Sequence, residues 1–139
     1  MESNRTFAPV LIGGTPNLGE RIGNKINLLK QLQAAGVWLI DASIIALYDA
    51  GSRPSARVVR TTILNSWLMY TGDVVKSACP EHLIVVGKGV GKVLSAELES
   101  HFQGKYTVIP QPNAHLSSEQ HIENFQKCFR ICAGTGRQH

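Results

Sequence analysis

The sequence predicts an α/β fold, a three-layer α/β/α sandwich around a four-stranded parallel sheet. The first observation is the stretch from residue 82 to 113, where the apolar run LIVV ends in a glycine turn, helical periodicity follows, and the β-rich run YTVI comes next. Strand, turn, helix and strand over this length form one βαβ unit, so its two strands should be parallel. The second observation is that short apolar runs alternate with helical periodicity along most of the chain, in the order β-α-β-α-β-α-β-α.

Length and composition favour one globular domain that spans residues 1–139, with a polar segment at residues 1–6 expected to be disordered. No apolar run reaches the roughly 20 residues needed to cross a bilayer, and no signal peptide is recognised. We therefore expect a cytoplasmic protein with no membrane partner. The net charge of +4 permits a polyanionic partner without requiring one. Cys128 and Cys132 are interpreted as buried reduced thiols rather than as metal ligands, and no cofactor or metal is expected.

The N-terminal part of the chain predicts two strands and one helix. The run APVLI at residues 8–12 is the first strand, and the breaker-rich turn GGTPNLG at residues 13–19 follows it. Apolar residues at helical spacing then predict a helix that ends near Gly36. The run VWLI at residues 37–40 predicts the next strand, which places Asp41 at its carboxyl end. The apolar face of the helix consists of Ile22, Ile26, Leu29 and Leu32.

A long helix follows, opened by Pro54 and closed by Pro80. Its predicted buried stripe has the spacing i, i+4, i+8, i+11, i+15 and consists of Val59, Ile63, Trp67, Tyr70 and Val74. Beyond the central βαβ unit, whose helix ends at Gly104, the spacing of Ser117 and Gln120 indicates a capping box. The final helix should bury Ile122, Phe125 and Phe129.

Right-handed crossovers place the carboxyl ends of all four predicted strands at one edge of the sheet, where α/β proteins bind ligands. Four loops meet there, at residues 13–17, 41–43, 87–89 and 110–118. The run GKGVGK at residues 87–92 has neither the glycine spacing of a dinucleotide site nor that of a P-loop. It indicates either a tight strand-to-helix turn or a backbone that approaches an anion.

Several polar side chains in these loops have two interpretations. Asp41 either caps the turn that follows it or faces a ligand. Gln111 and Asn113 are framed by prolines, so their amides either secure their own loop or contact a base edge. His115 is the one histidine in these loops, and it is either an inert surface residue or a contact residue.

Three arginines begin the long helix, Arg53, Arg57 and Arg60, at positions i, i+4 and i+7. No acidic residue lies between Asp49 and Asp73 to balance their charge. The two interpretations are a solvated helix face and a surface that contacts phosphate.

Taken together, these loops resemble the uracil-DNA glycosylase superfamily, particularly its mismatch-specific uracil/thymine branch. That branch has a Gly-Ile-Asn-Pro-Gly-Leu type motif after a strand, and GGTPNL stands at residues 13–18. Its Leu-Gly-Lys type turn is matched by VGK at residues 86–88. Its late motif, Asn-Pro-Ser-Gly-Leu-Ser or His-Pro-Ser-Pro-Leu-Ser, is matched by QPNAHLS at residues 111–117, which is one residue longer. LID at residues 39–41 is similar to the family's Leu-Leu-Asn strand.

The resemblance implies metal-free hydrolysis of an N-glycosidic bond in DNA after base flipping. It assigns water positioning and catalysis to Thr15 and Asp41, although the family has Asp or Asn where Thr15 stands and threonine cannot deprotonate water. Substrate contacts are assigned to Gly14, Asn17, Gln111, Asn113, His115 and Leu116. Phosphate contacts are assigned to Gly87, Lys88, Ser117, Arg53 and Arg57. The alternatives are a non-catalytic α/β module that binds a nucleotide or nucleic acid in the same cleft, and a structural subunit with a vestigial cleft.

Overall fold

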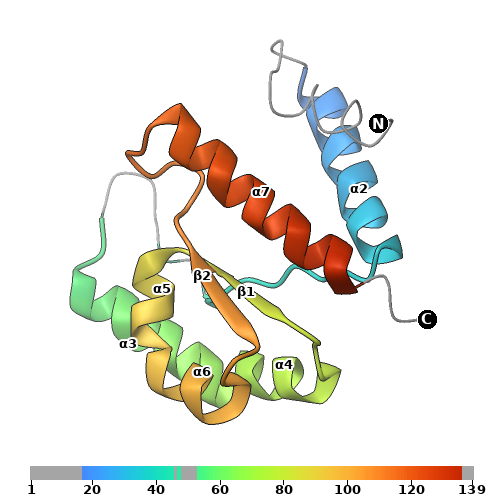
Figure 1. Cartoon of the computed structure of the whole chain (residues 1–139). Coiled ribbons are helices and arrows are strands. Elements are labelled where there is room, and N and C mark those ends of the chain that lie inside the picture. Colours follow the sequence, from blue (N-terminus) through green and yellow to red (C-terminus); the bar gives the residue numbers. More distant parts are fainter. Residues whose placement is uncertain (1–16, 46, 48–52, 136–139) are drawn as a thin grey trace. The chain divides into compact units, whose positions relative to one another are not determined.

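The computed structural model describes residues 17–45, 47 and 53–135 (Figure 1). Contacts within the chain define two units, Met1–Leu39 and Ile40–His139. Within the described residues, none of the helices has the length and apolar character needed to cross a membrane. The first predicted strand, at residues 8–12, and the polar segment at residues 1–6 lie outside the described residues.

The first unit contains helix α2, Leu18–Ala34. Asn17 caps its N-terminus, where its side-chain Oδ1 accepts a hydrogen bond of 2.9 Å from the Glu20 amide. At the other end, Gly36 adopts a positive φ of 77°, and the Val37 amide donates to the Leu32 carbonyl at 2.8 Å. This pair of features is the Schellman ending that glycine makes possible, so the predicted stop near Gly36 is confirmed.

The second unit begins its regular structure with a continuous helical segment formed by α3 (Ala56–Ser66), the π-helical turn η1 (Trp67–Thr71) and α4 (Gly72–Ala78). The Ser55 hydroxyl caps α3 by accepting a hydrogen bond from the Val58 amide at 3.3 Å. The helix therefore begins just after Pro54, close to the predicted start, and Arg53 lies before the helix rather than on its predicted face.

The central βαβ unit is confirmed. Strands β1 (Leu83–Val86) and β2 (Tyr106–Ile109) are parallel and pair in register from Leu83 with Tyr106 to Val86 with Ile109. Between them lie the short helices α5, Lys88–Val93, and α6, Ser95–Phe102. The chain leaves α6 through Gly104, whose φ of 73° makes it a suitable helix stop.

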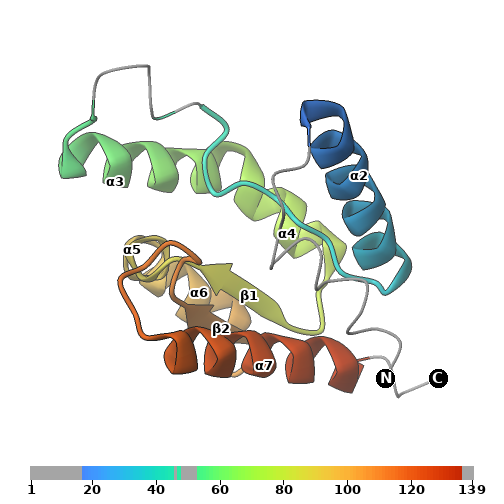
Figure 2. The same ribbon diagram turned by 90° about the horizontal axis from the view of Figure 1, so that it is seen from above.

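The last helix is α7, Ser118–Thr135. The capping box predicted before it is present, because the Ser117 amide donates to Gln120 Oε1 at 3.0 Å and the Gln120 amide donates to the Ser117 hydroxyl at 3.2 Å. Within the second unit, α3 and α4 lie along one face of the two strands and α7 lies along the other (Figure 2).

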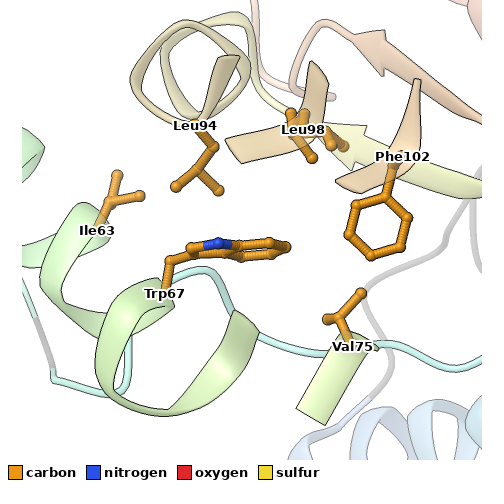
Figure 3. Close-up of a cluster of buried hydrophobic side chains, with 7 residues drawn as sticks. Ile63, Trp67, Val75, Leu94, Leu98 and Phe102 are labelled. Atoms are coloured by element: carbon orange, nitrogen blue, oxygen red, sulfur yellow. The ribbon is translucent and has the colours of Figure 1, made fainter. Parts of the chain in front are cut away.

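The core of the second unit is built around Trp67, which is 5% exposed (Figure 3). Its indole meets the Phe102 ring edge-on, with centroids 6.3 Å apart, and its Nε1 donates to Glu97 at 3.3 Å. The core thus joins the long helical segment to α5, α6 and β1, as the prediction that Trp67 is a core residue requires. The buried apolar residues are Ile63, Trp67, Val75, Val85, Leu94, Leu98 and Phe102.

The stripe predicted for the long helix is correct only in its first half. Val59 packs against the core and Ile63 and Trp67 are buried, but Tyr70 is 58% exposed and Val74 is 40% exposed. The cause is η1, where the Gly72 amide bonds to the Trp67 carbonyl five residues earlier rather than four. The extra residue in this turn moves the buried face on by one position, to Thr71 and Val75.

The predicted strand at residues 37–40 is wrong. These residues have no regular structure, and Trp38 and Leu39 are 77% and 70% exposed. The described residues therefore form a mixed α/β structure that is mostly helical, with a two-stranded parallel sheet. The final helix also differs from the prediction, since Ile122, Phe125 and Phe129 are each about half exposed.

Candidate nucleic-acid interface

The glycine turn after β1 is shaped by two close approaches. Gly87 has a φ of 112°, and a Cβ placed on it would lie 3.2 Å from the side-chain nitrogen of Gln111. Gly91 in α5 faces β2 so closely that a Cβ there would lie 2.6 Å from Val108 Cγ1. Both glycines thus fit the interpretation of GKGVGK as a tight strand-to-helix turn.

Gly89 differs from these two glycines. No atom outside its immediate neighbourhood lies within 4 Å of the Cβ that an alanine would introduce there. Internal packing therefore does not account for a glycine at this position. The turn exposes the backbone of Gly89 and the Lys88 side chain together, which is the arrangement expected where a phosphate approaches a backbone closely.

The loop after β2 meets this turn. The Gln111 side chain lies against Gly87, so the carboxyl ends of β1 and β2 bring these two predicted site residues together. The loop is closed by a bond of 3.0 Å from the Ala114 amide to the Gln111 carbonyl. A further contact of 3.0 Å joins His121 Nε2 in α7 to the Ala114 carbonyl. The loop is therefore held at both its β2 end and its α7 end.

The side-chain amides of Gln111 and Asn113 are exposed, and in the part of the chain that the structure describes neither side chain forms a hydrogen bond. The described contacts therefore do not support the interpretation that these two side chains only secure their own loop. His115 is also exposed, whereas Leu116 is half-buried. Ser117 uses its hydroxyl and its amide in the capping box, beside Glu119, whose pKa is lowered by its own backbone amide and by the Ser117 hydroxyl.

Helix α5, which follows the glycine turn, lies beside the basic helix α3. The two helices are in contact, and Val59 of α3 and Val90 of α5 pack against the same core (Figures 1 and 2). The cations on both helices and Arg53, which precedes α3, are exposed, and none of them forms an ion pair among the described residues. We call this set the α3–α5 basic surface; its members are Arg53, Arg57, Arg60, Lys88 and Lys92.

Acidic residues are absent from the segments that form this surface. None occurs in the sequence between Asp49 and Asp73, between Glu81 and Glu97, or between Glu99 and Glu119. Four cations on two touching helices, with Arg53 just before α3 and no carboxylate on either helix, give a positive field that attracts a polyanion. Lys92 was missed by the sequence reasoning, although its position four residues after Lys88 places both on one side of a helix.

The remaining predicted site residues belong to the N-terminal part of the sequence. Asp41 is exposed and follows a segment without regular structure, so its predicted place at the end of a strand is wrong. The neighbouring segment is instead attached to α3, where the Ile44 amide donates to the Ser66 hydroxyl at 3.2 Å. Asn17 caps α2, as described above. Gly14 and Thr15 lie outside the described residues.

The described residues contain no cluster of three or more His, Cys, Asp or Glu side chains arranged to hold a metal ion. The chain matches no family model, and comparisons with curated proteins and with solved structures gave no match. The resemblance to the uracil-DNA glycosylase superfamily consequently rests on the sequence motifs alone.

Proposed function

We propose that this protein binds DNA through the α3–α5 basic surface and the two loops at the carboxyl ends of β1 and β2. The observation that carries the proposal is the contact between α3 and α5, which unites cations from two separate parts of the sequence on segments free of carboxylates. Lysine and arginine side chains that are not paired with carboxylates gain most from phosphate contact, because counterions are released when they bind.

The test is the affinity of the full chain for a fluorescently labelled oligonucleotide, measured by anisotropy with single- and double-stranded probes. The triple variant Arg53→Glu, Arg57→Glu, Arg60→Glu should bind at least about tenfold more weakly at ~0.1 M salt. The matched control is Lys105→Glu, Lys127→Glu, Arg130→Glu, which changes the net charge equally on exposed residues elsewhere. Equal losses in the two variants would show that only net charge matters and would contradict the proposal.

The variant Gly89→Ala tests the contribution of the glycine turn to DNA binding without changing any charged side chain. Because the added methyl group meets no other atom, the variant should fold normally. If a phosphate approaches the Gly89 backbone, the methyl group should weaken oligonucleotide binding severalfold. Unchanged binding by Gly89→Ala would remove the turn from the proposed interface while leaving the arginines in it.

A second candidate function is base excision from DNA, with uracil or a related base as the substrate. The observation that favours it is a pair of exposed side-chain amides without hydrogen bonds among the described residues: Gln111, which lies against the glycine turn, and Asn113 in the same loop. Amide side chains offer both a donor and an acceptor to the edge of a flipped base, and they stabilise negative charge that develops on it. In this candidate Ser117 and Lys88 hold phosphates, and His115 or Leu116 fills the space that the base leaves.

Base excision also requires the wider sheet predicted from the sequence, in which residues 8–12 form a further parallel strand that brings Gly14 and Thr15 to the same edge. A single-turnover assay on uracil-containing oligonucleotides tests it. We expect slow excision that increases in Thr15→Asn, because threonine cannot ionise and orients water poorly. No excision by the wild type or by Thr15→Asn would leave DNA binding without chemistry.

A further inference from the structure

Helix α2 presents an apolar stripe that is not buried by the described residues of its own unit, 17–39. Taking roughly 100° per residue, four large apolar side chains fall within about 80° of one another on the helix. No residue of α2 is buried. The members of the stripe and their exposed fractions are Leu18 (70%), Ile22 (51%), Ile26 (45%) and Leu29 (38%).

The charges of α2 lie on the same side as this stripe. Arg21, Lys25 and Lys30 all fall within roughly 60° of its edges, whereas the one acidic residue, Glu20, falls roughly 160° from its centre. The three cations are exposed, and none is in an ion pair within the described ranges. A surface that covers the stripe therefore meets three positive charges as well.

Two more exposed apolar side chains follow directly after the Schellman ending of α2. Trp38 is 77% exposed and Leu39 is 70% exposed. An indole has an apolar body and a polar N–H, and such side chains are enriched where a membrane meets water. The first unit thus combines an amphipathic helix, flanking cations and an interfacial aromatic residue.

We propose that α2 and Trp38 dock on an anionic lipid surface. The apolar stripe enters the boundary between headgroups and acyl chains, and the three cations reach the lipid phosphates and carboxylates. DNA would satisfy the cations but leave the stripe in water. A second copy of the chain would cover the stripe but bring its cations against like charges. A helix that lies in the interface needs no spanning length, so the absence of a spanning run does not oppose this proposal.

The test uses the full chain with two kinds of vesicle, one of phosphatidylcholine alone and one of phosphatidylcholine mixed with phosphatidylserine. Sedimentation with the vesicles should require phosphatidylserine. Tryptophan emission should shift to shorter wavelength on binding, because Trp38 leaves water while Trp67 is already buried. No sedimentation with phosphatidylserine vesicles, or sedimentation without an emission shift, would overturn the proposal.

Charge reversal identifies the surface responsible. Arg21→Glu, Lys25→Glu, Lys30→Glu should weaken binding to phosphatidylserine vesicles by roughly 100-fold or more. The variant Arg53→Glu, Arg57→Glu, Arg60→Glu changes the net charge equally and should keep vesicle binding within about threefold. Equal losses would mean that the vesicles sense only net charge, which would overturn the assignment to α2.

A single apolar position tests whether another part of the protein covers the stripe. Ile26→Asp should abolish vesicle binding and leave the thermal midpoint of the full chain nearly unchanged, since the side chain is 45% exposed. A midpoint lowered by many degrees would show that the stripe is already buried against the chain or a second copy, and the lipid-docking proposal would fall. These results are independent of oligonucleotide binding, which the arginines of α3 test.

Discussion

Replacement of Gly91 by alanine tests the packing that positions the glycine turn. A Cβ on Gly91 would lie 2.6 Å from Val108 Cγ1 and 2.8 Å from Val108 Cγ2, which is too close without movement. Val108 is β-branched and packs against the core from a strand, so its methyl groups have little freedom to move aside. The overpacking should cost about 1–3 kcal/mol.

Alanine also stabilises a helix relative to glycine by about 0.5–1 kcal/mol. The net loss for Gly91→Ala should therefore be about 0.5–2 kcal/mol, which lowers the thermal midpoint of a chain of this size by about 2–10 °C. Circular dichroism on heating measures this change. The control is Gly89→Ala in the same helix, which meets no atom and should leave the midpoint unchanged or slightly raised.

A double variant isolates the contact. Val108→Ala removes both clashing methyl groups, so Gly91→Ala should cost at least ~1 kcal/mol less in its presence than in the wild type. If Gly91→Ala were as stable as Gly89→Ala, α5 could not lie against β2 as described, and the turn that joins them would have to be placed differently.

Three further predictions concern the core and the thiols. The buried hydroxyl of Thr71 has no hydrogen-bond partner, and it is the single such side-chain atom among the described residues. Thr71→Val should therefore raise the free energy of unfolding by about 1 kcal/mol in a denaturant titration. Exposed Thr61→Val is the control, and a loss of stability in Thr71→Val would mean that the hydroxyl is bonded. Trp67→Ala should cost about 3–5 kcal/mol, whereas Trp38→Ala at its exposed position should change the unfolding midpoint little. Cys128 and Cys132 are half-buried rather than buried as predicted, and this partial burial raises the pKa of both thiols. At pH 8 both should therefore be alkylated more slowly than exposed Cys79, and their contribution to stability should fall as pH rises above about 8.5. Equal alkylation rates for all three thiols would contradict this partial burial.

The sequence predicted those elements whose signals are local. The βαβ unit followed from two apolar runs separated by a stretch of helical periodicity, although that stretch forms two short helices rather than the one predicted. The C-terminal end of α2 and the N-terminal end of α7 followed from capping chemistry at Gly36 and at Ser117. These features depend on residues close in sequence, so they can be recognised from one amino-acid sequence.

Features that depend on distant parts of the chain were predicted less well. The run VWLI at residues 37–40 has the composition of a strand, but a strand exists only where a neighbour accepts its hydrogen bonds, and no segment among the described residues does so. The error at Tyr70 and Val74 has a different origin, because helical spacing assumes regular turns and η1 adds one residue. Asp41 was misplaced because its expected position depended on the strand predicted at residues 37–40.

The candidate site was predicted in part. Gly87 and Gln111 were expected at one sheet edge because parallel strands end on the same side, and the structure brings them into contact. The arginines of α3 were recognised as a cluster, but their contact with α5 could not be read from spacing. That contact joins Lys88 and Lys92 to the cluster, and it follows from the core that Ile63 and Leu94 share.

The salt dependence of oligonucleotide binding tests the α3–α5 basic surface most directly. For double-stranded DNA, the logarithm of the association constant falls linearly with the logarithm of salt concentration, with a slope of about −0.9 for each phosphate neutralised. Replacement of both Lys88 and Lys92 by glutamine should make this slope shallower by about 1.8, whereas Lys105→Gln with Lys127→Gln should leave it unchanged. An identical slope in the wild type and both variants would contradict the account, because the lysines of α5 would then contact no phosphate.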